Sequence, residues 1–255
     1  MHGTIAAMKP IVVANWKMNP PSWREGKALF DGVKKALDKA PQITLIVAPP
    51  SLYVRELRAT YKGKRISFAL QNVHFEPSGA FTGEISCAEA KDAKVSYVLV
   101  GHAERRAMGE TNEDTRKKVA AALASDVVPI LCVGEAKRAS DGAYFGVVKE
   151  QLRVGLADVA PAKLGRVIIA YEPVWAIGAE RAMSPRDMHE MAIFIRKTIV
   201  GLRGEGGMNA KILYGGSVDE TNAATMLREG DVHGLLVGRA SVDSAKLGAL
   251  MKSLV

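Results

Sequence analysis

The sequence predicts a single α/β domain in which eight parallel strands close into a barrel surrounded by helices, a (β/α)8 architecture. Short apolar runs rich in β-branched residues recur every few tens of residues along the 255-residue chain. Longer stretches with the periodicity of amphipathic helices separate these runs. No Ser-rich linker, low-complexity segment or shift in composition divides the chain. We therefore expect one barrel domain over residues 1–255, with residues 1–9 as an N-terminal extension.

Eight runs are expected to form the strands. They are apolar on both faces, as in parallel sheets covered by helices, and parallel neighbours need crossover connections. In chain order the runs are Ile11–Ala14, Thr44–Ala48, Ser67–Leu70, Val95–Val100, Val127–Val133, Val167–Ala170, Lys211–Tyr214 and Gly234–Val237. A parallel sheet with eight such units is expected to close into a barrel.

The intervening helices carry start signals and apolar faces. Ser184 is a candidate cap, Pro185 suits the first turn, and Asp187 lies where a carboxylate meets free N–H groups. Thr111–Asp114 opens another helix in the same way. After Ser184, the apolar residues that share one helical face are Met188, Met191, Ile195, Ile199 and Leu202.

Composition excludes several classes of protein. The formal charge of +8 favours anionic partners. The basic residues are scattered over presumed helix faces and are not interleaved with aromatic residues, so we expect no nucleic-acid partner. Cys87 and Cys132 are too few for a disulfide framework or a Cys-x-x-Cys metal site, which favours the reducing cytoplasm. The N-terminus lacks a secretory pattern, and no apolar stretch reaches the roughly 18 residues of a membrane span.

Polar residues gather where the expected strands end, which is the edge where barrels of this kind carry their active sites. They are Asn15, Lys17, Gln71, Asn72, His102, Glu104, Gly134, Glu135, Glu172, Gly215–Ser217, Gly238 and Arg239. The five histidines have no metal-ligand spacing, and no complete nucleotide-binding or nucleophilic-serine motif is present. A carboxylate, a histidine and a lysine remain beside Gly-rich turns whose N–H groups can bind phosphate, which indicates proton transfer on an anionic substrate.

Seven segments, in the same order along the chain, resemble the triosephosphate isomerase family from Ile11 to the C-terminus. They are 14–19, 71–72, 79–84, 101–106, 132–135, 171–178 and 214–218. The resemblance implies a TIM barrel that interconverts dihydroxyacetone phosphate and D-glyceraldehyde 3-phosphate in glycolysis and gluconeogenesis. It implies proton transfer through an enediolate, without cofactor or metal.

The resemblance also implies a role for each matching side chain. Glu172 would be the base that moves the proton between the two carbons, and His102 would polarise the substrate carbonyl as a neutral imidazole. Lys17 would supply positive charge to the phosphate and to the developing enediolate oxygen, with Asn15 orienting it. Glu104 would pair with the Lys17 ammonium.

Phosphate binding is implied at the ends of the last strands. The N–H groups of Gly178, Ser217 and Gly238 would hold the phosphate, together with Arg239, and residues 174–183 would form a lid. Three features depart from the family pattern: Ala103 stands where the family usually has Ser, Ala179–Met183 differs from the usual lid, and Arg239 replaces a second Gly. We expect Arg239 to preserve the backbone shape; the alternative is a positive φ angle there that would reshape the pocket.

Segment 79–84 resembles the loop that enters a neighbouring subunit in this family, so a homodimer is implied, with a tetramer as an open alternative. The expected contacts are Gln71, Asn72, Phe81, Thr82 at the tip, Glu84 and Arg105. Two other functions remain open: isomerisation of a larger ketose phosphate such as a tetrulose phosphate, and a phosphate-binding barrel without turnover.

Overall fold

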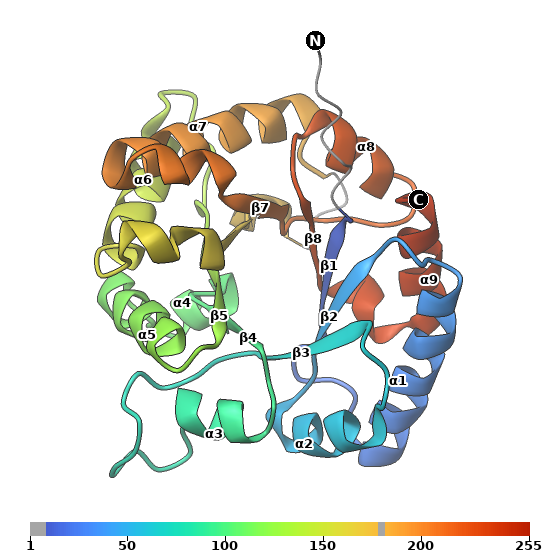
Figure 1. Ribbon diagram of the computed structural model, residues 1–255. Coiled ribbons are helices and arrows are strands. Elements are labelled where there is room, and N and C mark those ends of the chain that lie inside the picture. Colours follow the sequence, from blue (N-terminus) through green and yellow to red (C-terminus); the bar gives the residue numbers. More distant parts are fainter. Residues whose placement is uncertain (1–8, 178–181) are drawn as a thin grey trace.

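In the computed structural model, which describes residues 9–177 and 182–255, eight parallel strands form a closed barrel in chain order (Figure 1). Each strand pairs with the next, and β1 also pairs with β8, where Ile11 lies opposite Gly234. The prediction of a (β/α)8 barrel is confirmed. The strands are β1 (Ile11–Asn15), β2 (Thr44–Ala48), β3 (Ile66–Leu70), β4 (Tyr97–Val100), β5 (Val128–Val133), β6 (Ile168–Tyr171), β7 (Lys211–Tyr214) and β8 (Gly234–Val237).

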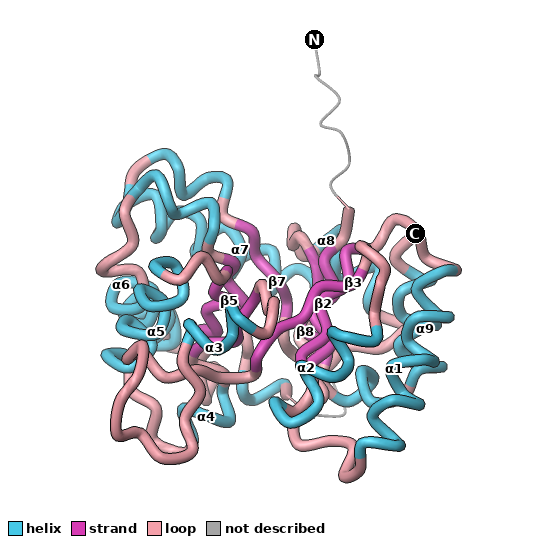
Figure 2. The backbone as a smooth tube through the Cα atoms, turned by 60° about the horizontal axis from the view of Figure 1, so that its bottom comes forward, coloured by secondary structure: helices cyan, strands magenta, loops and turns pink. Residues whose placement is uncertain are grey.

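Helices surround the barrel, as Figure 1 shows along the barrel and Figure 2 from a tilted direction. The last helix, α9, packs beside α1 and closes the ring (Figures 1 and 2). The α-helices are α1 (Trp23–Asp38), α2 (Ser51–Thr60), α3 (Cys87–Asp92), α4 (Ala103–Ala107), α5 (Asn112–Ala124), α6 (Ala143–Gly155), α7 (Pro185–Arg203), α8 (Ala223–Glu229) and α9 (Ser244–Ser253). Short 3-10 helices are η1 (Pro161–Arg166), η2 (Val174–Ala176), η3 (Glu205–Asn209) and η4 (Arg239–Val242).

The helix starts expected from the sequence are confirmed. Ser184 caps α7 by accepting a hydrogen bond from the Asp187 N–H at 3.1 Å. Thr111 caps α5, and its N–H and hydroxyl both donate to the Asp114 carboxylate, which completes a capping box. These caps satisfy N–H groups that would otherwise lack partners, so both helices begin at fixed residues.

Two expected strands begin too early, because an apolar residue before each belongs to a helix end. Val95 and Val127 each follow a residue with a left-handed backbone, Lys94 with φ 58° and Asp126 with φ 60°. The N–H of each valine donates to the carbonyl five residues earlier, at 2.9 and 2.8 Å. This geometry is that of a Schellman motif, whose final residue is often apolar. The other strand boundaries differ from expectation by at most one residue.

The core has two layers that leave the strand ends free for polar residues. One layer fills the barrel and the other lies between the barrel and the helices. The side chains inside the barrel include Val13, Ile46, Leu99, Ile130, Ile168, Leu213 and Leu236. Among the described residues, no helix is long and apolar enough to cross a membrane. The expected N-terminal extension, residues 1–9, lies outside the described residues except for Lys9.

Candidate active site

A cavity of about 340 Å³ opens at the C-terminal ends of β1, β6, β7 and β8. Its wall includes Asn15, Lys17, His102, Glu172, Gly215–Glu220, Gly238, Arg239 and Lys246. Asn15, Lys17, His102 and Glu172 therefore face one cavity, although they are far apart in the sequence, whereas Glu104 does not line it. Lys246, from the first turn of α9, is a lining residue that the sequence analysis did not identify.

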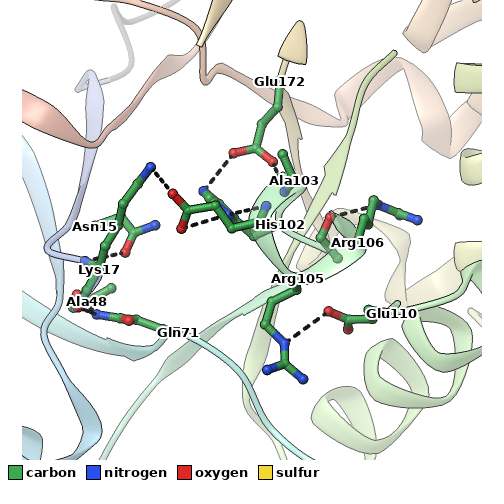
Figure 3. A network of polar contacts seen from close by, with 12 residues as sticks. Asn15, Lys17, Ala48, Gln71, His102, Ala103, Arg105, Arg106, Glu110 and Glu172 are labelled. Atoms are coloured by element: carbon green, nitrogen blue, oxygen red, sulfur yellow. Dashed lines mark hydrogen bonds and ion pairs between the residues drawn. The ribbon is translucent and has the colours of Figure 1, made fainter. Parts of the chain in front are cut away.

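Glu172 lies directly after β6, and only 2% of its surface is exposed. Its N–H donates to the Val133 carbonyl of β5 at 2.8 Å, which fixes the backbone at the strand end. The Ala103 N–H donates to Oε2 at 2.9 Å, and Oε1 lies 3.1 Å from His102 Nε2 (Figure 3). The carboxylate is thus removed from solvent and is held beside the imidazole.

His102 caps the short helix α4 and is also buried. Its Nδ1 accepts a hydrogen bond from the Glu104 N–H at 3.2 Å. A ring nitrogen that accepts a hydrogen bond carries no proton, so the proton of the neutral ring is on Nε2. The site therefore presents an imidazole N–H to the cavity, next to Glu172.

Lys17 follows β1 in a left-handed backbone conformation with φ 53°. Its N–H donates to Asn15 Oδ1 at 3.0 Å, and its ammonium lies 2.6 Å from Glu104 Oε1. The pairing of Lys17 with Glu104 expected from the sequence is present. Both side chains are partly exposed, so the ion pair contributes more to the direction of the ammonium than to stability.

The glycine-rich turns after β7 and β8 form part of the wall of the same cavity. A Cβ atom at Gly238 would lie 3.3 Å from Lys17 Cε, so this turn runs directly beside the Lys17 side chain. Arg239 does not have a positive φ angle; it begins η4, a conformation open to any side chain. The positive φ angle considered as the alternative is therefore absent at Arg239. Ser217 lines the same cavity.

The two ends of the expected lid, 174–183, contact the barrel through buried groups. Trp175 Nε1 donates to Glu135 at 2.8 Å, and the Met183 N–H donates to the Tyr214 hydroxyl at 3.3 Å. Burial raises the pKa of Tyr214 to about 12, so the hydroxyl remains protonated. Gly178 and residues 179–181, which were expected to bind phosphate and to form the altered part of the lid, lie outside the described residues.

Two further groups near the site, Glu135 and Arg106, were not given a role from the sequence. Glu135 is buried and accepts a hydrogen bond from the Tyr171 hydroxyl at 2.9 Å; burial, then the Glu135 charge, raises the pKa of Tyr171. Arg106 donates to the carbonyls of Gly101 and Cys132, at 2.8 and 3.2 Å. It thereby fixes the peptide just before His102. The sequence did not indicate this role, because an arginine on a short helix is typically a surface residue.

A second hollow, of about 370 Å³, lies on the other side of Lys17. Its lining includes Asn15, Lys17, Met18, Gln71, Asn72, Glu84, His102, Glu104, Arg105 and Met108. Four of the six expected dimer contacts, Gln71, Asn72, Glu84 and Arg105, therefore meet at one hollow. The other two, Phe81 and Thr82, are exposed on segment 79–84. Phe81 also lines a larger hollow of about 690 Å³ between that segment, α2 and α3, away from Glu172.

Metal chemistry has no candidate ligand set in the described part of the chain, where no three His, Cys, Asp or Glu side chains cluster suitably. The arrangement offers a buried carboxylate, an imidazole N–H and an ammonium around a cavity with glycine-rich turns. Such groups can move a proton and stabilise the negative charge that develops on a carbonyl oxygen.

Comparison with known proteins gives one consistent family. The family model described as triosephosphate isomerase matches residues 10–254. A triosephosphate isomerase of Endomicrobium trichonymphae is 40% identical over 246 residues, 96% of this chain and 98% of that protein. One from Roseiflexus sp. (strain RS-1) is 42% identical over 236 residues, 91% of this chain and 92% of that protein. The crystal structure of triosephosphate isomerase from Bartonella henselae superposes with a TM-score of 0.85 at 30% identity, covering 96% of this chain and 98% of that one.

Proposed function

The chain belongs to the triosephosphate isomerase family, and on this premise we propose how its own residues divide the chemistry. It is an isomerase that interconverts dihydroxyacetone phosphate and D-glyceraldehyde 3-phosphate, a reaction of glycolysis. The observation that carries the proposal is the buried pair of Glu172 and His102, with 3.1 Å between Oε1 and Nε2, at the wall of the cavity.

Glu172 is the base that takes the proton from one carbon of the substrate and returns it to the next. Its burial supports this role, because a carboxylate that is poorly solvated is a better base toward carbon. The Ala103 N–H holds the carboxylate in its resting position at 2.9 Å. To reach the substrate carbon, the carboxylate must turn from this donor and from His102.

His102 polarises the substrate carbonyl through its Nε2–H. The hydrogen bond from the Glu104 N–H to Nδ1 supports this role, since it leaves the ring neutral with its proton on the cavity side. Triosephosphate isomerase is the known example of a neutral imidazole in this role, where the ring donates to the enediolate oxygen without carrying a charge. In this chain the contact to Glu104 supports the same tautomer independently.

Lys17 stabilises the negative charge of the phosphate and of the enediolate. Asn15 holds the Lys17 N–H, and Glu104 holds the ammonium, at 3.0 and 2.6 Å. A charge fixed in this way needs no reorganisation when the substrate becomes an enediolate, which is the main source of electrostatic catalysis.

The phosphate binds at the glycine-rich end of the cavity. Ser217 and Gly238 contribute backbone N–H groups; Gly178, the third donor expected from the sequence, lies outside the described residues. Arg239 lies at the same wall, and in the described part of the chain its guanidinium has no hydrogen bond or ion pair. It is therefore available for a charge-assisted hydrogen bond to the phosphate.

We also propose that the chain works as a homodimer in the cytoplasm. Met18 and Met108, which are 91% and 70% exposed, both line the hollow beside Lys17, and Phe81, which is 41% exposed, lies on segment 79–84. Large apolar side chains exposed to solvent mark an interface. Segment 79–84 of a second copy, with Thr82 at its tip, would enter the hollow beside Lys17. The cytoplasmic location is supported by the place of the reaction in glycolysis and by the free, buried thiols of Cys87 and Cys132.

A coupled isomerase assay tests the proposed function. We expect a much higher kcat/KM for glyceraldehyde 3-phosphate than for a four-carbon ketose phosphate, with the coupling enzymes in excess so that they do not limit the rate. A preference for the four-carbon substrate would contradict the assignment. If neither substrate is turned over, the chain would be a phosphate-binding barrel without catalytic activity. No observation favours these two alternatives.

A further inference from the structure

The phosphate end of the substrate cavity carries two cations whose charge is not neutralised by a neighbouring side chain. Arg239 begins η4, and Lys246 lies in the first turn of α9; both are exposed and both line the cavity. Within residues 9–177 and 182–255, neither side chain makes a hydrogen bond or an ion pair. The phosphate contact proposed above uses Arg239 but gives no role to Lys246.

The backbone that carries these cations is held by hydrogen bonds. The Lys246 N–H donates to Asp243 Oδ1 at 3.1 Å, and this carboxylate caps the start of α9. The Ser241 hydroxyl donates to the Asn15 carbonyl at 2.8 Å, which ties η4 to the end of β1. Arg239 and Lys246 therefore extend from segments whose positions are set before a ligand binds, and such preorganisation lowers the entropic cost of binding.

Two carboxylates on the same wall do not neutralise the cations. Asp219 and Glu220 also line the cavity, but in the described part of the chain neither forms an ion pair with the two cations. The Thr221 hydroxyl and N–H donate to Asp219 Oδ1 at 2.6 and 2.9 Å. The hydroxyl contact is the main reason why the pKa of Asp219 is lowered. Asp219 is thus engaged within its own turn, and the positive charge of Arg239 and Lys246 is available to a ligand.

The cavity has room for more than the three-carbon substrate. Its volume is about 340 Å³, and sites for drug-sized ligands begin at about 300 Å³. A single phosphate at Ser217 and Gly238 would meet Arg239, the next residue along the chain. Lys246 reaches the same wall from a different element, α9, so a second phosphate group is needed to bring both cations into use.

We propose that Arg239 and Lys246 form a second anion site at the phosphate end of the cavity, which binds the outer group of a ligand with two phosphates. Arg239 has five N–H donors in a planar fork, so it can bond to both phosphates, and the compact ammonium of Lys246 binds only the outer one. Such a ligand takes the place of the substrate phosphate and inhibits the isomerase competitively. The inference rests on the proposed function, because it requires that the inner phosphate binds at Ser217 and Gly238.

Inhibition constants for three probes at equal ionic strength test this site. The probes are inorganic phosphate, pyrophosphate with adjacent phosphates, and propanediol bisphosphate with separated phosphates. The parent should bind at least one two-phosphate probe about tenfold or more tightly than phosphate, which is the gain expected from a charge-assisted hydrogen bond to the outer group. Lys246→Ala should raise the inhibition constant of that probe about tenfold, and that of phosphate by less than about threefold.

The probe that loses more in Lys246→Ala identifies the class of ligand. A larger loss for pyrophosphate places the two phosphates side by side, as in a diphosphate. A larger loss for propanediol bisphosphate places them apart, as in a sugar bisphosphate. Either outcome supports a second anion site and assigns its spacing.

Lys252→Ala is the matched control. Lys252 lies in the last turn of the same helix, is exposed, and does not line the cavity. Its substitution removes the same charge, and solvent screens that charge from the phosphate end, so all three inhibition constants should change by less than about threefold. Equal effects of Lys246→Ala and Lys252→Ala would mean that only the overall charge of the chain matters, which would overturn the proposal.

Two other results would overturn it as well. One is that neither two-phosphate probe binds the parent more tightly than phosphate. The other is that Lys246→Ala weakens all three probes by the same factor, as a change in the general fold would do. A parent enzyme that inorganic phosphate does not inhibit at all would instead refute the inner phosphate site and the proposed function, so the two failures are distinguishable.

Discussion

Replacement of Gly134 by alanine should move the catalytic carboxylate without changing any catalytic side chain. A Cβ atom at Gly134 would lie 1.8 Å from the carbonyl oxygen of Glu172 and 3.2 Å from its Cα. Gly134 cannot easily withdraw, because Gln151 holds both its N–H and its carbonyl. The collision is therefore relieved mainly by a shift of the Glu172 backbone.

The size of the effect follows from this overlap. Ordinary contact begins near 3.4 Å, so the Glu172 peptide must move by more than about 1 Å. A misplacement of about 1 Å in a reacting group costs about 100-fold in rate, and overpacking costs about 1–3 kcal/mol of stability. We expect kcat to fall by about 100-fold, with an unfolding free energy lower by about 1–3 kcal/mol and the fold retained.

Steady-state assays and urea denaturation measure both quantities. Gly146→Ala is the control, since a Cβ atom there would meet nothing within 4 Å inside the helix α6. It should stabilise the chain by about 0.5–1 kcal/mol and leave kcat unchanged. A folded Gly134→Ala variant with kcat within about threefold of the parent would refute the reasoning that the backbone contact sets the position of the base.

Three other predictions concern the site and the fold. Ala103→Ser should leave turnover unchanged or raise it modestly in a steady-state assay, because the hydroxyl adds a hydrogen bond of about 0.5–1.5 kcal/mol to the resting carboxylate; a large loss would mean that the site has repacked. Arg239→Gly should raise the inhibition constant of inorganic phosphate and leave kcat within about tenfold, whereas an unchanged inhibition constant would contradict a phosphate contact. Burial, then the Arg196 charge, lowers the pKa of His233 from 6.5, so the unfolded chain binds more protons and the unfolding free energy should fall as the pH drops below about 6.5. His233→Asn, which preserves an acceptor for the Ile212 N–H, should flatten that dependence in urea titrations, and an unchanged slope would exclude His233 as its source.

The strands were predictable because their signal is local. A barrel strand buried on both faces is a continuous apolar run, and each run in this chain stands out from its polar surroundings. The errors arose where an apolar residue served a different element. Val95 and Val127 end the helices α3 and α5 through hydrogen bonds that reach back five residues, and such a helix end looks like the start of a strand in the sequence.

The site was predictable only as a set of positions. Strand ends in a closed barrel meet at one edge, so Asn15, Lys17, His102 and Glu172 could be grouped before any distance was known. Apart from the contacts of Lys17 with Asn15 and Glu104, which the resemblance implied, the hydrogen-bond partners of these residues were not predictable, since they depend on the register and twist of neighbouring strands. Gln71 is an example, because its amide contacts a residue 54 positions away through a backbone carbonyl, which every residue has.

Proton exchange with solvent tests the central claim, that Glu172 is the base. The reaction is run in D₂O with glyceraldehyde 3-phosphate, and NMR measures the deuterium that enters dihydroxyacetone phosphate. Glu172→Gln preserves the shape of the side chain and an acceptor for the Ala103 N–H. The account predicts that this variant binds inorganic phosphate like the parent but loses exchange and isomerisation together, by at least about 100-fold. Exchange at the parent rate in a folded Glu172→Gln variant would contradict it.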